Sequence, residues 1–208
     1  PMRYGGNYKS YGPQYPRGIQ EGNGVPADGD LWVSYSVNKE DMWISRIPVP
    51  VEINASAHAD DDFSKNKSIA ELTDLNIYSP VWAPVSLEDQ WLKLQDKDPF
   101  DYAKVERKIP ASKELKVSFD LKAGQNNKGT LQIEFLDENG IACSRMELTD
   151  DGIFRLKGGS RFANMMKYEA GKIYHVEAVL STVDRNIQVY VDGKRVGLRM
   201  FYAPVATV

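Results

Sequence analysis

Aromatic and amide side chains in several parts of the chain have the chemistry needed to hold a sugar ring. Trp91 and Tyr190 offer flat faces on which the C–H face of a pyranose can stack. Asn126, in the stretch GQNNKG, offers an amide that can hydrogen-bond to hydroxyl groups. We therefore select Tyr190, Trp91 and Asn126 as candidate carbohydrate-binding residues, although GQNNKG is equally an ordinary turn. Trp82 lies in a proline-flanked segment and is expected to pack across a sheet edge instead.

A second candidate group lies near the start of the chain. Arg17 has a planar guanidinium that can hold a carboxylate through two parallel hydrogen bonds. Tyr11, Tyr15 and Glu21 lie close to it in the sequence. The alternative interpretation is that the tyrosines pack against neighbouring strands and that Arg17 is a surface residue.

An acidic run that ends at Asp62 has the chemistry of a calcium site. Calcium prefers several oxygen ligands, so Asp61 and Asp62 are candidate ligands of a structural calcium ion. The alternative is a solvated acidic linker. The two histidines, His58 and His175, are far apart in the sequence, which argues against a zinc site or a Ser/His/Asp triad. No cofactor is predicted to be required.

Short β-strands are the elements that would position most of these side chains. In residues 114–122, Leu115, Val117, Phe119 and Leu121 alternate with polar residues, which is the period of a strand with one buried face. Similar segments, separated by turn sequences such as DENG and DG, follow at 130–137, 141–149, 153–158, 172–181 and 187–196. This spacing predicts an all-β fold with the strands of a β-sandwich.

The chain divides into three regions by composition. Residues 29–51 read as two strands joined by a tight turn, after a start rich in Gly, Tyr and Pro. Residues 52–76 form a polar passage with at most one helical turn around 68–72. We therefore expect a first region at 1–51, a linker and domain entry at 52–76, and a sandwich at 77–208.

Length and charge limit the classes of function. The 208 residues suffice for one sizeable β domain, or for a domain and a fragment of another. The net charge of −3 and the absence of a long apolar run argue against nucleic acid and membrane as partners. Because translation begins with Met, the first residue, Pro1, leads us to expect a trimmed chain or one that begins inside a longer protein; no signal peptide pattern is visible.

The order of several segments within residues 60–208 resembles a known family. The segments DDF, LNIYSPVWAPVSL, LKVSFDLKAG, GTLQIEFLDENG and YVDG follow one another as in a concanavalin A-like, laminin-G-like jelly roll. The closest resemblance is to the C-terminal domain appended to bacterial polysaccharide-degrading enzymes. It implies a non-catalytic accessory or glycan-binding domain.

The first 51 residues resemble a different family. The stretch YGGNYKSYGPQYPRGIQEGNG, followed by LWVSYSVNKEDMWISRIPVPV, is similar to the end of a sialidase-like, BNR-type β-propeller. This resemblance implies that Arg17 clamps a carboxylate and that Tyr11 or Tyr15 is a nucleophile activated by Glu21. The other arginines and the general acid of such a site would come from upstream blades. The β-hairpin is then a remnant of a propeller domain.

Together the resemblances imply the C-terminal portion of a secreted, exo-acting, sialidase-like glycoside hydrolase, in the periplasm or outside the cell. The chain alone would be inactive, with a glycan and an upstream propeller domain, of the same protein or of a neighbouring chain, as its partners. One alternative is a stand-alone glycan-binding or adhesion module. Another is a catalytic jelly-roll glucanase or lyase, for which Glu134 and Glu147 lie on candidate strands without a spacing that shows them to converge.

Overall fold

The chain is all-β, as the sequence predicts. The computed structural model describes residues 13–19, 30–37, 41–47, 55–98 and 102–208. In these ranges every strand pairing is antiparallel, and the only helices are two short 3₁₀ turns. The internal contacts divide the chain into two units, Pro1–Arg107 and Lys108–Val208, which are described in turn.

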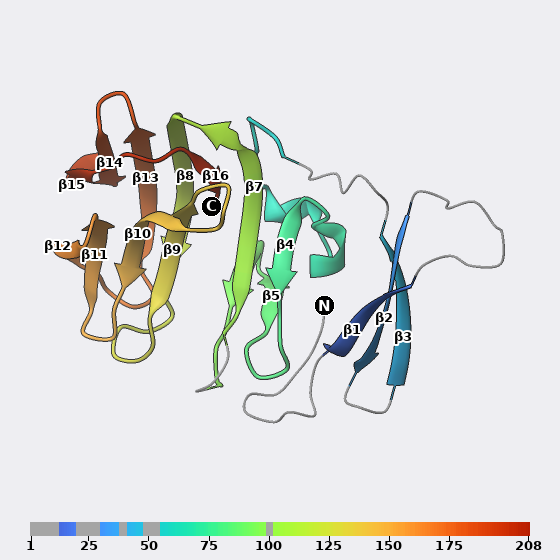
Figure 1. Ribbon diagram of the computed structural model, residues 1–208. Helices are drawn as coiled ribbons and strands as arrows, with labels where there is room; N and C mark the ends of the chain where they lie inside the picture. The colour runs from blue at the N-terminus through green and yellow to red at the C-terminus, as the bar shows by residue number, and fades with distance from the viewer. Residues whose placement is uncertain (1–12, 20–29, 38–40, 48–54, 99–101) are drawn as a thin grey trace. The chain divides into compact units, whose positions relative to one another are not determined.

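A three-stranded sheet begins the first unit (Figure 1). Its strands, in the order β1-β2-β3, are β1 (Pro13–Ile19), β2 (Leu31–Val37) and β3 (Asp41–Ile47). The predicted hairpin is confirmed, because β2 pairs with β3 from Leu31 opposite Ile47 to Val37 opposite Asp41. The residues of its turn and of its proline-containing exit lie outside the described residues. β1 adds a third strand within the Gly-, Tyr- and Pro-rich start of the chain, and it carries a bulge between Gln14 and Arg17.

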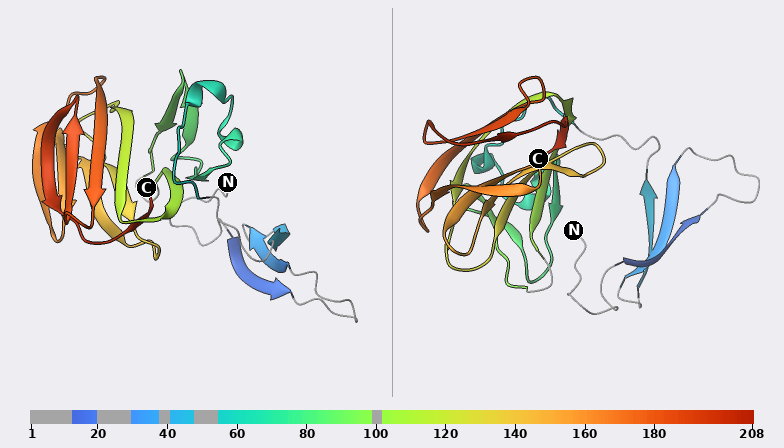
Figure 2. Two further views of the ribbon diagram at one scale, coloured as in Figure 1. Left: turned by 90° about the horizontal axis from the view of Figure 1, so that it is seen from above. Right: turned by 60° about the vertical axis from the view of Figure 1, so that its left-hand side comes forward.

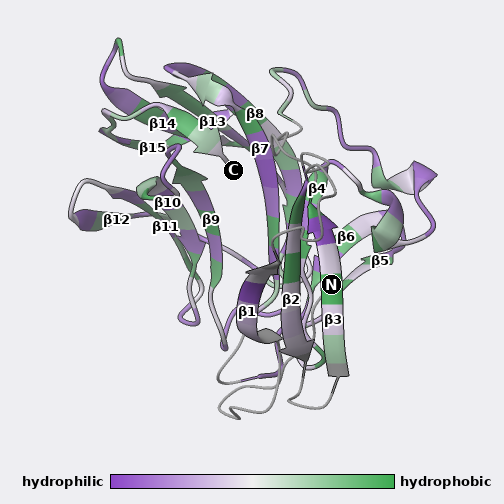
Figure 3. Cartoon of the chain, turned by 45° about the vertical axis from the view of Figure 1, so that its right-hand side comes forward, coloured by the Kyte–Doolittle hydropathy of each residue, from purple (hydrophilic) through white to green (hydrophobic). Residues whose placement is uncertain are grey.

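Both faces of this sheet carry apolar side chains. Tyr35 lies opposite Trp43, and the period of a strand places Met42 and Ile44 on the other face. The exposed fractions are 53% for Trp43, 74% for Met42 and 63% for Ile44. Figure 3 shows hydrophobic residues along β2 and β3. A sheet with apolar residues on both faces is stabilised when other elements cover it.

The rest of the first unit consists of short elements. They are η1 (Phe63–Lys65), η2 (Ile69–Glu71), β4 (Leu75–Tyr78), β5 (Val85–Glu88) and β6 (Trp91–Leu94). η2 confirms the predicted helical turn around 68–72, but the expectation of at most one such turn in 52–76 is wrong, because η1 is a second one, capped by the Asp62 side chain. β5 and β6 form a hairpin whose two turn residues, Asp89 and Gln90, both have positive φ, as a type I′ turn requires. β4 pairs with residues 104–107, the first half of β7 (Lys104–Ser112).

The second unit has a sandwich-like arrangement of two sheets (Figure 2). One sheet has the order β12-β11-β10-β9-β16-β7, with β7 taking part through its second half, and the other has the order β15-β14-β13-β8. The strands are β8 (Glu114–Lys122), β9 (Leu131–Leu136), β10 (Ala142–Leu148), β11 (Ile153–Gly158), β12 (Arg161–Lys167), β13 (Ile173–Ser181), β14 (Asn186–Val191), β15 (Lys194–Met200) and β16 (Val205–Thr207).

Strand alternation builds the core of the second unit. On β14, Ile187, Val189 and Val191 are buried while the residues between them are half-buried on the other face. The apolar side chains of β8 pack against the same core, as their alternation predicts. Each buried aliphatic side chain of this kind stabilises the fold by about 1.5–3 kcal/mol relative to an exposed one. The core is completed by buried residues from β9, β10, β11 and β13, among them Phe135, Met146, Leu156 and Val176.

The predicted Asp-Gly turn joins β14 to β15. Asp192 has φ 50° and Gly193 has φ 77°, so both central residues adopt the left-handed conformation of a type I′ turn. The Asp192 carboxylate also accepts a hydrogen bond from the backbone N–H of His175, at 3.0 Å. The turn is therefore fixed both by its backbone preference and by a contact to β13. Among the described helices, neither approaches the length and apolar character that crossing a bilayer demands.

Candidate functional site

A groove of about 720 Å³ lies where three segments of the second unit meet. The segments are the β11–β12 turn with the start of β12, the β13–β14 turn, and the end of β15 with the residue pair that follows it. The volume is within the range of roughly 300–1,000 Å³ that small-molecule sites occupy. We call this site the basic groove; it is lined by residues 158–162, 185–186, 198–200 and 202.

Two backbone contacts bring these segments together. The backbone N–H of Phe201 donates to the carbonyl of Arg185 at 3.1 Å, which ties the chain after β15 to the β13–β14 turn. Gly158, at the end of β11, lies so close to β15 that a Cβ placed on it would collide with the Cβ of Arg199 and stand 3.1 Å from the carbonyl oxygen of Met200. A glycine at position 158 is therefore what allows β11 and β15 to approach each other.

Three arginines give the basic groove its charge. Arg161 and Arg185 are exposed, and Arg199 is half-buried with its Nη1 donating to the carbonyl of Leu198 at 2.9 Å. The lining contains no Asp or Glu. In the part of the chain that the structure describes, none of the three arginines forms an ion pair. The groove therefore carries uncompensated positive charge.

Apolar side chains share the groove with the arginines. Phe162, Leu198, Met200 and Tyr202 are 36%, 47%, 65% and 60% exposed. The Tyr202 hydroxyl donates to the sulfur of Met200 at 3.1 Å, which holds the two side chains together. A site with aromatic surfaces and convergent polar donors suits a ligand that has an apolar face and a polar rim.

Cations from the neighbouring strand cover the Phe162 ring. The Arg155 guanidinium lies 4.3 Å and the Lys157 ammonium 5.6 Å from the ring centroid. Distances below about 6 Å are those of cation–π contacts. The orientation of Phe162 is therefore coupled to the charged face of β11.

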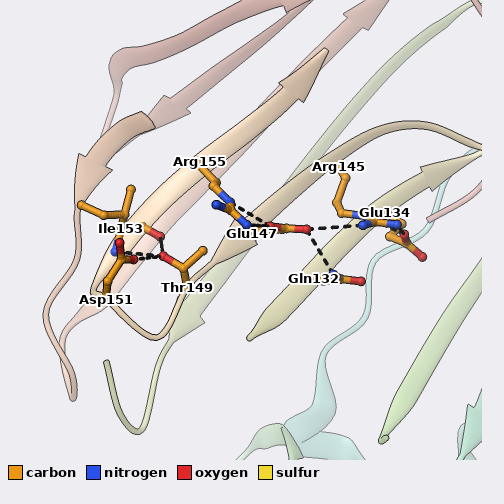
Figure 4. A network of polar contacts seen from close by, with 8 residues as sticks. All are labelled: Gln132, Glu134, Arg145, Glu147, Thr149, Asp151, Ile153 and Arg155. Atoms are coloured by element: carbon orange, nitrogen blue, oxygen red, sulfur yellow. Dashed lines mark hydrogen bonds and ion pairs between the residues drawn. The ribbon is translucent and has the colours of Figure 1, made fainter. Parts of the chain in front are cut away.

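A polar network beside the groove satisfies a buried carboxylate (Figure 4). Glu147, on β10, is only 2% exposed. Its Oε1 accepts from Gln132 Nε2 at 3.1 Å and from Arg145 Nη1 at 3.4 Å, and its Oε2 accepts from Arg155 Nε at 2.8 Å. Arg145 also donates from Nε to Glu134 at 2.7 Å. Glu134 and Glu147 are thus bridged by an arginine, and both oxygens of Glu147 and one oxygen of Glu134 have partners within the protein.

The predicted carbohydrate-binding residues do not line the basic groove. Tyr190 is half-buried on the face of β14 opposite the core, and its hydroxyl donates to Gln188 Oε1 at 2.9 Å. Asn126 is half-buried in the loop before β9 and lies beside Gly152 in the β10–β11 turn. Trp91 is half-buried on β6, in the first unit. Trp82, which the sequence suggests is packed, is instead 62% exposed, although its backbone carbonyl accepts a hydrogen bond from the Lys97 N–H at 2.9 Å.

The predicted group around Arg17 is described only in part. Tyr15 and Arg17 lie on β1 and are both exposed, Tyr15 by 70% and with φ 54°. The Arg17 carbonyl accepts a hydrogen bond from Ser34 Oγ at 3.5 Å, across the pairing with β2. Tyr11 and Glu21 lie outside the described residues.

The predicted calcium ligands have cationic partners. Asp61 pairs with Arg107, and Asp62 caps η1 by accepting from the Ser64 N–H at 3.1 Å while its other oxygen lies 3.1 Å from Lys65 Nζ. Hydrogen bonding from Ser64, and then from Lys65, lowers the pKa of the Asp62 carboxyl from 3.8 to about 2. Both aspartates line a small pocket of about 270 Å³. A search of the described residues finds no group of three or more His, Cys, Asp or Glu placed to hold a metal ion.

The groove arginines are the residues that sequence reasoning missed. Arg161 follows the turn GGS and Arg185 lies in the turn TVDRN, while Arg199 lies near the end of a strand. Each of the three is unremarkable alone, since a surface arginine next to a turn is common. The available signal was the lack of a nearby acid at Arg161 and Arg199. It gains meaning only when the packing of the two sheets places the three segments around one groove.

Comparison with known proteins identifies the family. Residues 75–208 match the model of a family described as "Sialidase-like, CBM domain". A solved structure named "Sialidase" is 91% identical over the whole of this chain, with a TM-score of 0.77, and the chain covers 19% of that longer chain. No curated protein matches. The predicted resemblance to sialidase-like proteins is confirmed, and the chain belongs to the sialidase-like CBM domain family.

Proposed function

We propose that the second unit is a non-catalytic glycan-binding domain and that the basic groove is its binding site. The single observation that carries this proposal is the combination, in one groove of about 720 Å³, of the exposed aromatic ring of Tyr202 with arginine donors. The family name, in which CBM stands for carbohydrate-binding module, supports it.

The groove has the groups that sugar recognition uses. The exposed ring of Tyr202 can stack on the C–H face of a pyranose, and Ser160 and Asn186 can hydrogen-bond to its hydroxyls. Glycoside hydrolysis would require a pair of carboxyl groups flanking the bond to be cleaved. The lining offers none, and the nearby Glu134 and Glu147 are engaged by Arg145. The arrangement therefore supports binding without cleavage.

The finer assignments of fold and domain are part of the same proposal. We infer that the sandwich is a concanavalin A-like jelly roll over residues 77–208, joined by 52–76 to a propeller remnant at 1–51. The antiparallel two-sheet order of the second unit supports the first assignment. The exposed Met42, Trp43 and Ile44 support the second, because a sheet with two apolar faces fits inside a larger array.

The whole protein would be an exo-acting, sialidase-like glycoside hydrolase. The chain spans 19% of the solved sialidase it matches, so most of a catalytic site would come from elsewhere. In this proposal Tyr15 and Arg17, with Tyr11 and Glu21, contribute a share of that site. An upstream propeller domain, of the same protein or of a neighbouring chain, would supply the rest.

Binding by the 208-residue chain to an array of immobilised polysaccharides tests the function. We expect binding that falls by roughly tenfold or more when Tyr202 is changed to alanine, as for a central aromatic contact. The matched comparison is Tyr190→Ala, which removes a tyrosine from the same unit but outside the groove. Loss of binding with Tyr190→Ala alone would place the site on β14 instead. Absence of any glycan binding, or hydrolysis of a glycoside by this chain alone, would contradict the proposal.

A further inference from the structure

The arginines of the basic groove enter it from three separate segments. Arg161 begins β12, Arg185 lies in the β13–β14 turn and Arg199 lies near the end of β15. We infer that the groove selects a glycan segment that carries more than one negatively charged group, an inference that rests on the glycan-binding function proposed above.

The charge of the groove differs from that of its surroundings. The chain as a whole has a net charge of −3, so no general attraction draws an anion to it. In the same unit, Arg145 and Arg155 are paired with Glu134 and Glu147. Asp184 precedes Arg185 in the chain but does not line the groove. The groove therefore gathers three arginines that have no ion-pair partner among the described residues, and its lining has no acidic residue.

The number of arginines exceeds what one acidic group can use. A guanidinium holds one carboxylate or sulfate through two parallel hydrogen bonds. One arginine is therefore enough to bind the acidic group of a single sugar. Like charges gathered in one groove repel each other, and the repulsion falls when several anions are bound together. A segment with repeated acidic groups fits three arginines that come from different directions better than one terminal acidic residue does.

Two kinds of glycan supply this chemistry. Uronate-type sugars carry carboxylates, and sulfated sugars carry sulfate esters; both present oxygens that match the arginine fork. The aromatic ring of Tyr202 suits either, because it would contact the ring carbons and not the charged group.

Calorimetric titration of the 208-residue chain with four probes tests the inference. The probes are glucuronic acid, a galacturonate tetramer, a chondroitin sulfate tetramer and a neutral cello-oligosaccharide of the same length. We expect at least one multiply charged tetramer to bind about tenfold or more tighter than the monosaccharide and the neutral probe. Its affinity should fall when the ionic strength is raised, because salt screens exposed charges. The tetramer that binds tighter tells whether carboxylate or sulfate is the preferred group.

Substitutions at the exposed arginines complete the test. Arg161→Gln and Arg185→Gln should each weaken binding of the charged tetramer by roughly five- to twentyfold, since each removes a charge-assisted hydrogen bond from a solvent-accessible site. Arg195→Gln is the matched control, because Arg195 is exposed on β15 but lies outside the groove.

The outcomes separate the two proposals. Equal affinity for the neutral and charged tetramers, or for the acidic monosaccharide and the charged tetramers, would overturn the inference and leave glycan binding in place. An equal loss with Arg195→Gln would also overturn it, because the effect would then come from net charge and not from the groove. Failure of every probe and of the polysaccharide array to bind would overturn the glycan-binding function itself.

Discussion

Arg155 holds the buried carboxylate of Glu147 through two donors, Nε at 2.8 Å and Nη2 at 2.7 Å from the same oxygen. A carboxylate that is 2% exposed must keep its partners, because an unpaired buried charge is costly. The same guanidinium lies over the ring of Phe162 in the basic groove. One arginine thus links the stability of β10 to the shape of the groove.

Removing this arginine should destabilise the second unit. We expect Arg155→Leu to lower the free energy of unfolding by roughly 2–4 kcal/mol, because Glu147 stays buried with fewer donors. Chemical denaturation measures the loss. The control is Lys116→Met, which breaks the more exposed pair with Glu177 and should cost less than about 1 kcal/mol. Similar losses for the two variants would show that the Glu147 network contributes no more than a surface pair.

A methyl group at position 158 should separate β11 from β15. Gly158→Ala places a Cβ against Arg199 and Met200, and such overpacking costs roughly 1–3 kcal/mol. We also expect weaker glycan binding, because Arg199 and Met200 line the groove. Thermal unfolding and titration measure both effects. Gly124→Ala is the control, since a Cβ there meets no atom within 4 Å. Unchanged stability in Gly158→Ala would contradict the close approach.

Asp62 should titrate at unusually low pH. Its folded pKa of about 2 lies below the ordinary value of 3.8, so the carboxylate stabilises the fold above the ordinary pKa. That contribution is lost as the pH falls from about 4 through about 2. NMR titration of the Asp62 side chain measures the pKa directly. In Lys65→Met the pKa should rise, because one of its causes is removed, and an unchanged value in that variant would refute the assignment.

Calcium should have little effect on stability near Asp61 and Asp62. Arg107 and Lys65 already neutralise these carboxylates, and an incoming cation would have to displace them. We expect the melting temperature to be the same in chelator and in millimolar calcium. If calcium raises the melting temperature and this increase disappears in Asp61→Asn, the predicted site does bind the metal.

Local patterns could be predicted from the sequence, and long-range assembly could not. The alternation in β8 and the Asp-Gly turn at 192–193 depend on neighbouring residues, so both agree with the structure. The period of β1 is obscured by the Gly and Pro residues at the start of the chain, so no local pattern gives its bounds. The prediction for Trp82 is wrong. Its flanking prolines suggest packing, but the side chain is exposed, because whether a loop side chain is covered depends on elements far away in the sequence.

The candidate site illustrates the same limit. The face of β14 on which Tyr190 lies follows from alternation alone, since its neighbours Val189 and Val191 are buried. The groove depends on β15 lying close to β11, which no local pattern encodes, and its arginines come from segments up to 38 positions apart, from Arg161 to Arg199. Only the packing of the two sheets, with β11 in one and β15 in the other, brings such residues together.

The hydrogen bond from Phe201 to the Arg185 carbonyl has a consequence for the thermodynamics of recognition. It holds two walls of the groove in place before any ligand arrives, so the backbone is preorganised and loses little conformational entropy on binding. The cost of ordering then falls mainly on long side chains, of which Arg161 and Arg185 are exposed. We expect a single domain to bind quickly but with modest affinity. Tight attachment is reached when a polymer engages several copies of the domain at once.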